Sequence, residues 1–299
     1  MDIMLSGGTG FIGKALTSYL ISQGHRIYVL TRRENHPADS ENLQYVQWDP
    51  SHSSLPFSSI DAVINLAGEP INSGRWTPSK KEQIMNSRIT STRALITHLK
   101  QLDHLPKTFI NASAVGYYGT SLFETFTEDN LKHGTDFLAQ TVVNWENEAQ
   151  KADQLGIRTI YARFGIVLGK NEGALPRMIL PYQLFIGGTI GSGDQWVSWI
   201  HLDDAVKMIA FALENEAVSG PLNVTAPHPV TMKQFGKTIS KVLNRPHWIP
   251  VPEFVLRGLL GEMSSLIVDG QKVLPKKAMN NDYVHSYSNI EEALFDILK

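Results

Sequence analysis

Three glycines near the N-terminus have the spacing of a phosphate-binding turn. The motif GGTGFIG begins at Gly7 and places Gly10 and Gly13 at successive intervals of three residues. Glycine suits such a turn because a residue without Cβ lets the backbone approach a pyrophosphate closely. The motif follows a strand-like segment at 2–6 and opens a helix-like segment at 11–23, whose first N–H groups attract phosphate. This arrangement predicts a dinucleotide site rather than a glycine-rich turn without a ligand.

The end of the second predicted strand, 26–31, indicates which dinucleotide binds. The strand finishes at Thr31 and is followed by Arg32 and Arg33. Folds that bind NAD place an acid here to hold the ribose 2′-hydroxyl, whereas an arginine can hold a 2′-phosphate. We therefore expect NADP(H) rather than NAD(H), with exposed arginines that bind nothing as the alternative.

Four side chains downstream could hold a substrate oxygen and move its proton. Ser113 ends the strand-like run KTFINAS and suits the first role, while Tyr117, Tyr118 or Glu146 could act as the proton-transfer group. Each has a structural alternative. The two tyrosines could be aromatic packing or a stacking surface for substrate, and Glu146 could be the partner of an arginine such as Arg163.

His201, in the segment SWIHLDD, could also titrate near neutral pH. A structural role is favoured for it, because a lone histidine is a weak signal. We expect it to help position the following helix, with Asp203 or Asp204 as the cap. The chain has no cysteine, which excludes disulfides, thiolate metal sites and a cysteine nucleophile, and we predict no metal site.

The elements that must position these residues alternate between strands and helices. The predicted strands are 2–6, 26–31, 43–48, 61–68, 107–113 and 158–164, and the predicted helices are 11–23, 79–103 and 135–155. Thr77 is the expected N-cap of the long helix, with Pro78 at its first position. Continuous apolar strands separated by helices predict an α/β fold, a Rossmann-type doubly wound parallel sheet.

After about residue 165 the elements become shorter and glycine and proline become frequent. The expected strands here are 197–202 and 221–226, and the expected helices are 203–215, 231–243 and 289–298. We assign 1–165, with parts of 190–230, to an NADP-binding Rossmann domain. We assign about 166–299 to the remaining sheet elements and a small C-terminal α/β lobe that contributes to the substrate site.

The composition indicates a protein that acts on small molecules. The chain has 299 residues, of which 27 are Lys or Arg and 29 are Asp or Glu, for a net charge of −2. Such a balance offers no basic surface for nucleic acid or an anionic membrane. Without cysteine or a leader-like N-terminus, we expect a cytoplasmic protein, and the long helices allow either a monomer or a homodimer.

Several motifs together resemble a known family. GGTGFIG, NLAG, NASAVGYYG and WIHLDD occur in the order found in the extended short-chain dehydrogenase/reductases of the NAD-dependent epimerase/dehydratase family. GEPINSGRW, RFGIVLG and the tail that begins PVPEFVLRGLLGEM are similar to an atypical, YfcH-like "epimerase family" subgroup. The resemblance covers nearly the whole chain.

This resemblance implies an NADP-binding Rossmann domain with a small C-terminal lobe. It also implies positions for the cofactor: the pyrophosphate against Thr9, Gly10, Phe11 and Ile12, the 2′-phosphate near Thr31 and Arg32, the adenosine side near Leu66, Ala67 and Gly68, and further contacts from Arg88 and Val167. Taken without the resemblance, Arg88 could be a solvated helix residue.

The sequence departs from the family in its proton-transfer chemistry. Typical members carry a tyrosine whose pKa is lowered by a lysine four residues later, but none of the nine tyrosines here has such a lysine. Two interpretations follow. The chain is an NADP-dependent oxidoreductase or epimerase-like enzyme that acts on an unidentified small polar substrate, or it is an NADP(H)-sensing, partner-binding protein with reduced catalysis.

Overall fold

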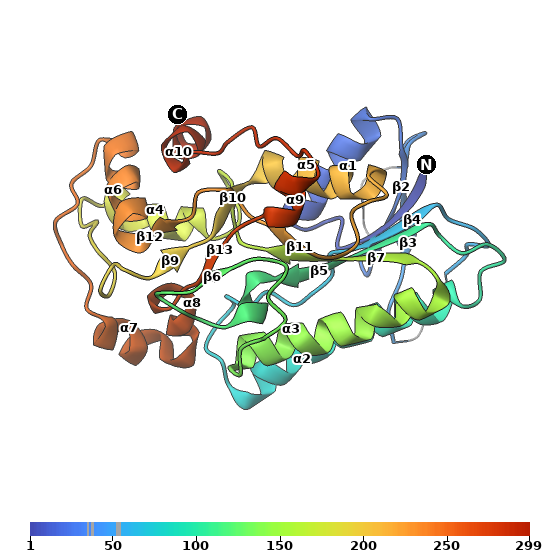
Figure 1. Cartoon of the computed structure of the whole chain (residues 1–299), viewed down its shortest axis with the longest axis horizontal. Coiled ribbons are helices and arrows are strands. Elements are labelled where there is room, and N and C mark those ends of the chain that lie inside the picture. The colour runs from blue at the N-terminus through green and yellow to red at the C-terminus, as the bar shows by residue number, and fades with distance from the viewer. Residues whose placement is uncertain (35, 37–38, 52–54) are drawn as a thin grey trace.

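A seven-stranded parallel sheet forms the centre of the protein (Figure 1). The structure is a computed structural model that describes residues 1–34, 36, 39–51 and 55–299. The strands are β1 (Asp2–Ser6), β2 (Arg26–Thr31), β3 (Leu43–Gln47), β4 (Ala62–Asn65), β5 (Thr108–Ala114), β7 (Arg158–Phe164) and β11 (Gly220–Val224). Their order is β3-β2-β1-β4-β5-β7-β11, which is the doubly wound arrangement that the sequence predicts.

Two pairs of helices cover the two faces of this sheet (Figure 1). The pairs are α1 (Phe11–Ser22) with α5 (Leu202–Glu214), and α2 (Pro78–Leu99) with α3 (Phe137–Ala149). Because both faces are covered, the central strands are apolar throughout, and every residue of β4 is buried. The carboxyl ends of β1, β4, β5 and β7 therefore meet at one edge of a rigid sheet, next to the small lobe.

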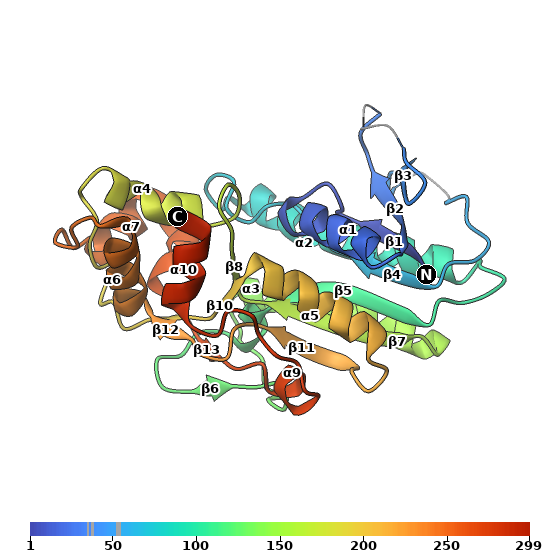
Figure 2. The same cartoon turned by 90° about the horizontal axis from the view of Figure 1, so that it is seen from above.

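The small lobe has its own core and lies at the carboxyl edge of the sheet (Figure 2). Its helices are α4 (Leu175–Gln183), α6 (Met232–Leu243), α7 (Glu253–Leu260), α8 (Ser265–Val268) and α10 (Ile290–Leu298), whereas α9 (Lys276–Asn280) packs against β11 of the central sheet. Three two-stranded sheets join it to the rest of the chain: β8 (Ile166–Leu168) with β10 (Trp199–His201), β9 (Trp196–Val197) with β12 (Val230–Thr231), and β6 (Thr125–Phe126) with β13 (Lys272–Val273). Trp199 and Phe235 are buried in its core.

Several element boundaries differ from those predicted. The strand expected over 61–68 ends at Asn65, because the residues after it form the loop beside the glycine turn. The helix expected over 135–155 ends at Ala149 and continues as a 3-10 helix. The single strand expected over 197–202 is two short strands, β9 and β10, which belong to different small sheets.

The starts of two helices test the capping predictions. Thr77 caps α2 as expected, its side chain accepting a hydrogen bond from the Lys80 N–H, with Pro78 at the first position. The expected cap of α5 was wrong. His201, not Asp203 or Asp204, is the N-cap, and its Nδ1 accepts from the Asp203 N–H at 3.1 Å.

Asp204 instead ties α5 to the C-terminal segment. Its carboxylate accepts from the backbone N–H groups of Ser286 and Tyr287, both at 2.8 Å. The His201 imidazole can take the place of a carboxylate as the cap of α5 because its unprotonated nitrogen is a hydrogen-bond acceptor.

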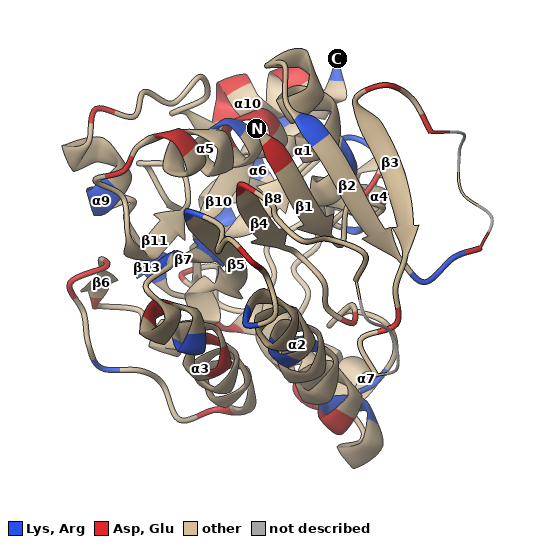
Figure 3. Ribbon diagram, turned by 90° about the vertical axis from the view of Figure 1, so that its right-hand side faces the viewer, with Lys and Arg blue, Asp and Glu red and all other residues tan. Residues whose placement is uncertain are grey.

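Acidic and basic residues are interspersed along the chain (Figure 3). Helix α2 carries both acidic and basic residues in the view of Figure 3, consistent with the near-neutral composition. Within the described ranges, no helix is both long and apolar enough to cross a bilayer.

Candidate functional site

The glycine turn between β1 and α1 is fixed by close contacts of its backbone. Gly7 has a φ of +79°, and a Cβ on it would lie 2.7 Å from the carbonyl carbon of Leu66. A Cβ on Gly13 would lie only 2.2 Å from the Gly7 oxygen. Gly7 and Gly13 are therefore required by packing, whether or not a ligand binds.

Gly10 differs from the other two glycines. Among the described residues, a Cβ on Gly10 would have one neighbour within 4 Å, the Gly7 oxygen at 3.3 Å. Gly10 is also the N-cap of α1, and its N–H donates to the Gly7 oxygen at 3.0 Å. As a glycine it has no side chain to cap the helix, and no acid occupies the first turn. Open space in front of uncapped N–H groups fits a pyrophosphate.

The end of β2 carries the two residues predicted to lie near the 2′-phosphate of a bound dinucleotide. Thr31 is buried, and its hydroxyl accepts a hydrogen bond from the Arg33 N–H at 3.1 Å. Arg32, between them, is exposed. The strand end thus offers a guanidinium where an NAD-binding fold would offer a carboxylate.

The end of β4 lies against the glycine turn and is held by side-chain amides. The Leu66 N–H donates to the Ser6 oxygen at 2.8 Å, and the Asn65 side chain accepts from the Ala67 N–H at 3.3 Å. Asn65 in turn donates to Asn111 at 2.7 Å and to Thr92 at 2.9 Å. This buried amide network rigidifies the loop at Leu66 and Ala67, and the sequence analysis missed it.

Arg88, on α2, contacts the loop that follows β4 and is not a solvated helix residue. Its Nη1 donates to the carbonyl oxygens of Glu69 and Ile84 at 3.1 and 2.8 Å. A Cβ on Gly68 would lie 3.1 Å from its guanidinium carbon. Burial lowers the pKa of Arg88 to about 10, so the group stays cationic at neutral pH. A fixed positive charge therefore lies under the loop that follows β4.

Ser113 and Glu146 form the first link of a second, buried site. Ser113 lies near the end of β5 with 3% of its surface exposed, and its hydroxyl donates to Glu146 Oε1 at 2.5 Å. Glu146 lies on α3, four residues after Val142 and eight after Leu138. Intervals of four place these three side chains on one face of the helix. This face of α3 therefore carries two apolar residues and an acid, and it does not carry a tyrosine followed four residues later by a lysine.

Arg163 at the end of β7 brings all four candidate proton-transfer residues together. Its Nε and Nη2 donate to the two Glu146 oxygens, each at 2.8 Å, and its Nη1 donates to the Tyr118 hydroxyl at 2.9 Å. The face of the guanidinium lies 3.5 Å from the centre of the Tyr117 ring. The sequence analysis considered Arg163 only as a partner for Glu146, and this pairing is present.

The electrostatics of this cluster favour fixed charges. Burial alone would lower the pKa of Arg163, but the hydrogen bonds and charge of Glu146 raise it above its ordinary value. The guanidinium and the carboxylate therefore stabilise each other in a site from which water is largely excluded.

The two tyrosines are already engaged. Tyr118 donates to Asn223 Oδ1 at 2.8 Å and stacks on Phe126, and burial raises its pKa to about 12 against the opposing charge of Arg163. Tyr117 is half-buried and donates to the Leu131 oxygen at 3.3 Å. These contacts support the packing alternative for both residues. Asn223 was missed because nothing in the segment PLNVTA marks it.

The polar side chains at the end of the glycine-rich segment before β10 make structural contacts. The Gln195 amide donates to the Ile190 and Ile267 oxygens, both at 3.0 Å, and the Trp196 indole donates to the Leu122 oxygen at 2.9 Å. These contacts join this segment to Ile267 and to the loop at Leu122. Val167, in β8, is buried beside Ile200 in the parallel β8–β10 pair.

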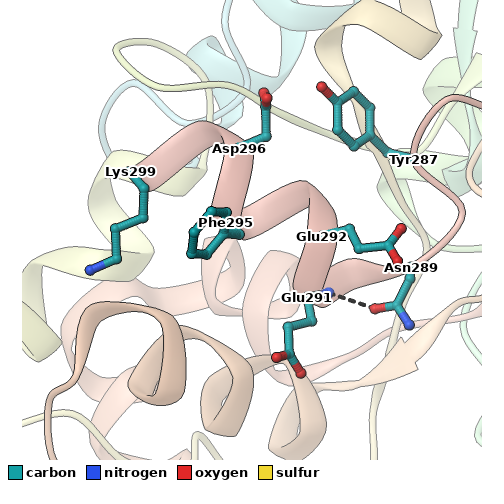
Figure 4. A pocket seen from close by; sticks show the side chains of 7 residues that line it. All are labelled: Tyr287, Asn289, Glu291, Glu292, Phe295, Asp296 and Lys299. Atoms are coloured by element: carbon teal, nitrogen blue, oxygen red, sulfur yellow. Dashed lines mark hydrogen bonds between the residues drawn. The ribbon is translucent and has the colours of Figure 1, made fainter.

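A hollow of about 670 Å³ lies elsewhere, along α10. Figure 4 shows its lining, which contains none of the predicted site residues: Tyr287, Asn289, Glu291, Glu292, Phe295, Asp296 and Lys299. At one wall His201 Nε2 lies 3.3 Å from Asp296 Oδ2, and Glu291 forms an ion pair with Lys241 at 2.6 Å. Among the residues that the structure describes, no group of three acidic or histidine side chains is placed to hold a metal.

Two family models match the chain. The NAD dependent epimerase/dehydratase family matches residues 3–225, and a Domain of unknown function (DUF1731) matches residues 251–297. The first includes the glycine turn, the β4 loop, and the Ser113–Arg163 cluster.

Relatives and solved structures match along the full length. "Epimerase family protein YfhF" of Bacillus subtilis is 52% identical over 301 residues, covering 100% of this chain and 98% of that protein. The crystal structure of human epimerase family protein SDR39U1 with NADPH has a TM-score of 0.90 and 34% identity, covering 99% of both chains. A UDP-glucuronic acid 4-epimerase from Bacillus cereus, at 18% identity and a TM-score of 0.79 over 99% of this chain and 98% of that one, shares the fold.

Proposed function

The chain belongs to the NAD dependent epimerase/dehydratase family, and from that premise we propose that it is an NADP(H)-dependent oxidoreductase or epimerase-like enzyme that acts on a small polar substrate. The observation that carries the proposal is the space at Gly10. There the N-terminus of α1 is uncapped, lacks acids and can receive a pyrophosphate. A packing role alone would not require glycine at this position.

Two further observations favour NADP(H) within this pair of cofactors. Arg32 follows β2 where an acid would repel a 2′-phosphate. In addition, human SDR39U1, at 34% identity, was crystallised with NADPH. The residues proposed to hold the cofactor are the turn Gly7–Gly13, Thr31, Arg32, Leu66, Ala67, Gly68, Arg88 and Val167.

When bound, NADP(H) would supply hydride chemistry, and the chain would supply orientation and proton transfer. The Ser113 hydroxyl donates its hydrogen bond to Glu146, so its oxygen lone pairs are available to accept a hydrogen bond from a substrate hydroxyl. A proton leaving that hydroxyl would pass to Ser113 Oγ while the Ser113 proton passes to Glu146 Oε1. In this role Ser113 touches the substrate, and Arg163 positions Glu146.

A second candidate function is an NADP(H)-sensing protein with reduced catalysis. The observation that favours it is the bidentate Arg163–Glu146 pair, because both carboxylate oxygens are already engaged in hydrogen bonds within the protein. The Tyr118 hydroxyl, which already has hydrogen bonds with Asn223 and Arg163, also favours this second function.

The cofactor part of the proposal is tested by titrating the purified protein and its Arg32→Ala variant with NADPH and NADH. We expect the substitution to weaken NADPH by about tenfold to a hundredfold, the value of a charged hydrogen bond, and to leave NADH nearly unchanged. Equal losses for the two cofactors would remove the assignment of Arg32 to the 2′-phosphate. No binding of either nucleotide by the unmodified protein would refute the proposed function.

The two candidate functions are separated by following the decay of NADPH fluorescence against a panel of carbonyl compounds and quinones. Oxidation of NADPH by a panel member that fails in Glu146→Gln supports the enzyme with Glu146 as the proton-transfer group, which supplies a proton through Ser113 when the substrate is reduced. Tight binding without oxidation by any compound favours the sensor.

A further inference from the structure

The segment that joins β8 to α4 crosses the predicted cofactor site. We define residues 169–177 as the strap, which runs from the end of β8 through the first turn of α4. In Figure 2 this part of the chain lies between α4 and α1. Its contacts on one side are with α1 and on the other with the loop after β4, the two elements proposed to hold the dinucleotide.

The first of these contacts is with the ring of Phe11, the residue that opens α1. A Cβ on Gly169 would lie 2.6 Å from a ring carbon of Phe11, and one on Gly173 would lie 2.9 Å from another. Gly173 also has a φ of +85°, a conformation that other residues rarely adopt. The two glycines therefore let the strap rest directly on the residue that follows the Gly10 cap.

Two polar contacts hold the strap, one near its middle and one at its C-terminal end. Glu172 forms an ion pair with Lys14, in the second turn of α1, with Oε1 and Nζ 3.0 Å apart. Arg177 donates from Nη1 to the Asn72 oxygen at 2.8 Å, in the loop that follows β4. The strap thus connects the phosphate turn to the adjacent strand end.

The first half of the strap is weakly held. Among the described residues, none of 170–173 takes part in a backbone–backbone hydrogen bond, and all four are exposed. The Lys14–Glu172 side chains are 61% and 48% exposed, so the ion pair contributes little stability and is screened by salt. Such a segment can open without unfolding the sheet or the lobe.

We propose that the strap is a gate that closes over the bound dinucleotide and controls its exchange, with the Lys14–Glu172 pair as its latch. This inference rests on the proposed binding of NADP(H) to the glycine turn. Closure would hold the cofactor against the N-terminus of α1, and release would require the strap to lift from Phe11 and Lys14.

The absence of cysteine in the chain allows a direct test. In the double variant Lys14→Cys with Glu172→Cys, a short bifunctional thiol reagent would connect the strap to α1. NADPH release is followed by stopped-flow loss of energy transfer from tryptophan to the nicotinamide, with excess NADP⁺ as the competitor. We expect the cross-linked, loaded protein to release NADPH at least tenfold more slowly than the same variant before cross-linking.

A matched control uses an ion pair away from the strap. Lys276 and Asp129 lie 2.6 Å apart, are similarly exposed, and join α9 to the loop after β6. Cross-linking Lys276→Cys to Asp129→Cys should leave NADPH release unchanged. If both cross-links slow release equally, or if neither does, the strap is not the gate.

Substitution of the latch tests the opposite direction. Glu172→Ala should speed NADPH release by about twofold to fivefold at low salt, the range for an exposed ion pair, and this difference should vanish at high salt. Asp129→Ala is its control and should change nothing. Unaltered release from Glu172→Ala at low salt would overturn the latch. A wild-type protein that binds no NADPH would instead refute the proposed function, so the two failures are distinguishable.

Discussion

The proposed cofactor region around the glycine turn and the proposed proton-transfer region around Arg163 differ in how their polar groups are arranged. At the glycine turn, backbone groups face open space, and Gly10 leaves room that no side chain of the described residues fills. Around Arg163, by contrast, the polar side chains are buried and already bonded to one another. Both regions lie at the carboxyl edge of one parallel sheet, so the difference arises from side chains rather than from the fold.

This difference separates what the fold guarantees from what the side chains must add. A doubly wound sheet brings a helix N-terminus to its carboxyl edge whatever the substrate, so nucleotide binding follows from the backbone. Proton transfer requires an unsaturated acid or base, and that requirement is local. Here the link between Ser113 and Glu146 places a hydroxyl proton between an alcohol oxygen and a carboxylate oxygen.

The largest effect should come from Arg163→Met. The substitution would leave the Glu146 carboxylate buried without its counter-charge, and removing one partner of a buried pair costs about 3–5 kcal/mol. We expect the free energy of unfolding in urea to fall by that amount. NADPH affinity of the molecules that remain folded should stay within about twofold of wild type, because the glycine turn is built separately.

The double variant Arg163→Met with Glu146→Leu provides the control. Removing both charges should restore most of the lost stability, since an apolar pair of similar volume can replace a buried ion pair. If the double variant is no more stable than the single one, the cost lies in packing rather than in charge. If NADPH affinity falls together with stability in Arg163→Met, the two regions are coupled and the comparison fails.

The next effect in size is expected from Gly10→Val. The valine side chain would occupy the space assigned to the pyrophosphate, so NADPH affinity should fall by about tenfold or more, as for a side chain forced into a filled site. The melting temperature without cofactor should change little, because the Cβ meets only the Gly7 oxygen at 3.3 Å.

Gly13→Ala sharpens the test within the same motif. Its Cβ would lie 2.2 Å from the Gly7 oxygen, so the apo protein itself should be destabilised. Thermal unfolding without and with NADPH separates the two variants. Gly10→Val that binds NADPH with wild-type affinity would contradict the placement of the pyrophosphate.

The parts of the molecule with a local physical signature could be predicted from the sequence. Apolar runs predict buried parallel strands, the glycine spacing predicts the turn, and Thr77-Pro78 predicts the start of α2, which the structure confirms. The family was also predictable, because its motifs occur in order along nearly the whole chain.

The rest depends on contacts that are distant in the sequence. His201 and the two following aspartates are all acceptable caps by residue type, and the choice of His201 is settled by Asp204 binding the segment at 286–287. Likewise, Arg88 has the periodicity of a surface residue until the loop at Gly68 covers it. Asn223 joins the cluster from a strand 105 residues away from Tyr118 in the chain.

The smallest effect on stability should come from Ser113→Ala, and it tests whether the proton-transfer region has any function beyond structure. Glu146 keeps both bonds from Arg163, so loss of the serine hydrogen bond should lower the free energy of unfolding by only about 1 kcal/mol. NADPH affinity should be unchanged. If turnover with a panel substrate falls while both of these quantities hold, Ser113 acts on the substrate. If turnover is unchanged, the Ser113–Glu146 link is structural, and the cofactor region would then be the whole of the functional site.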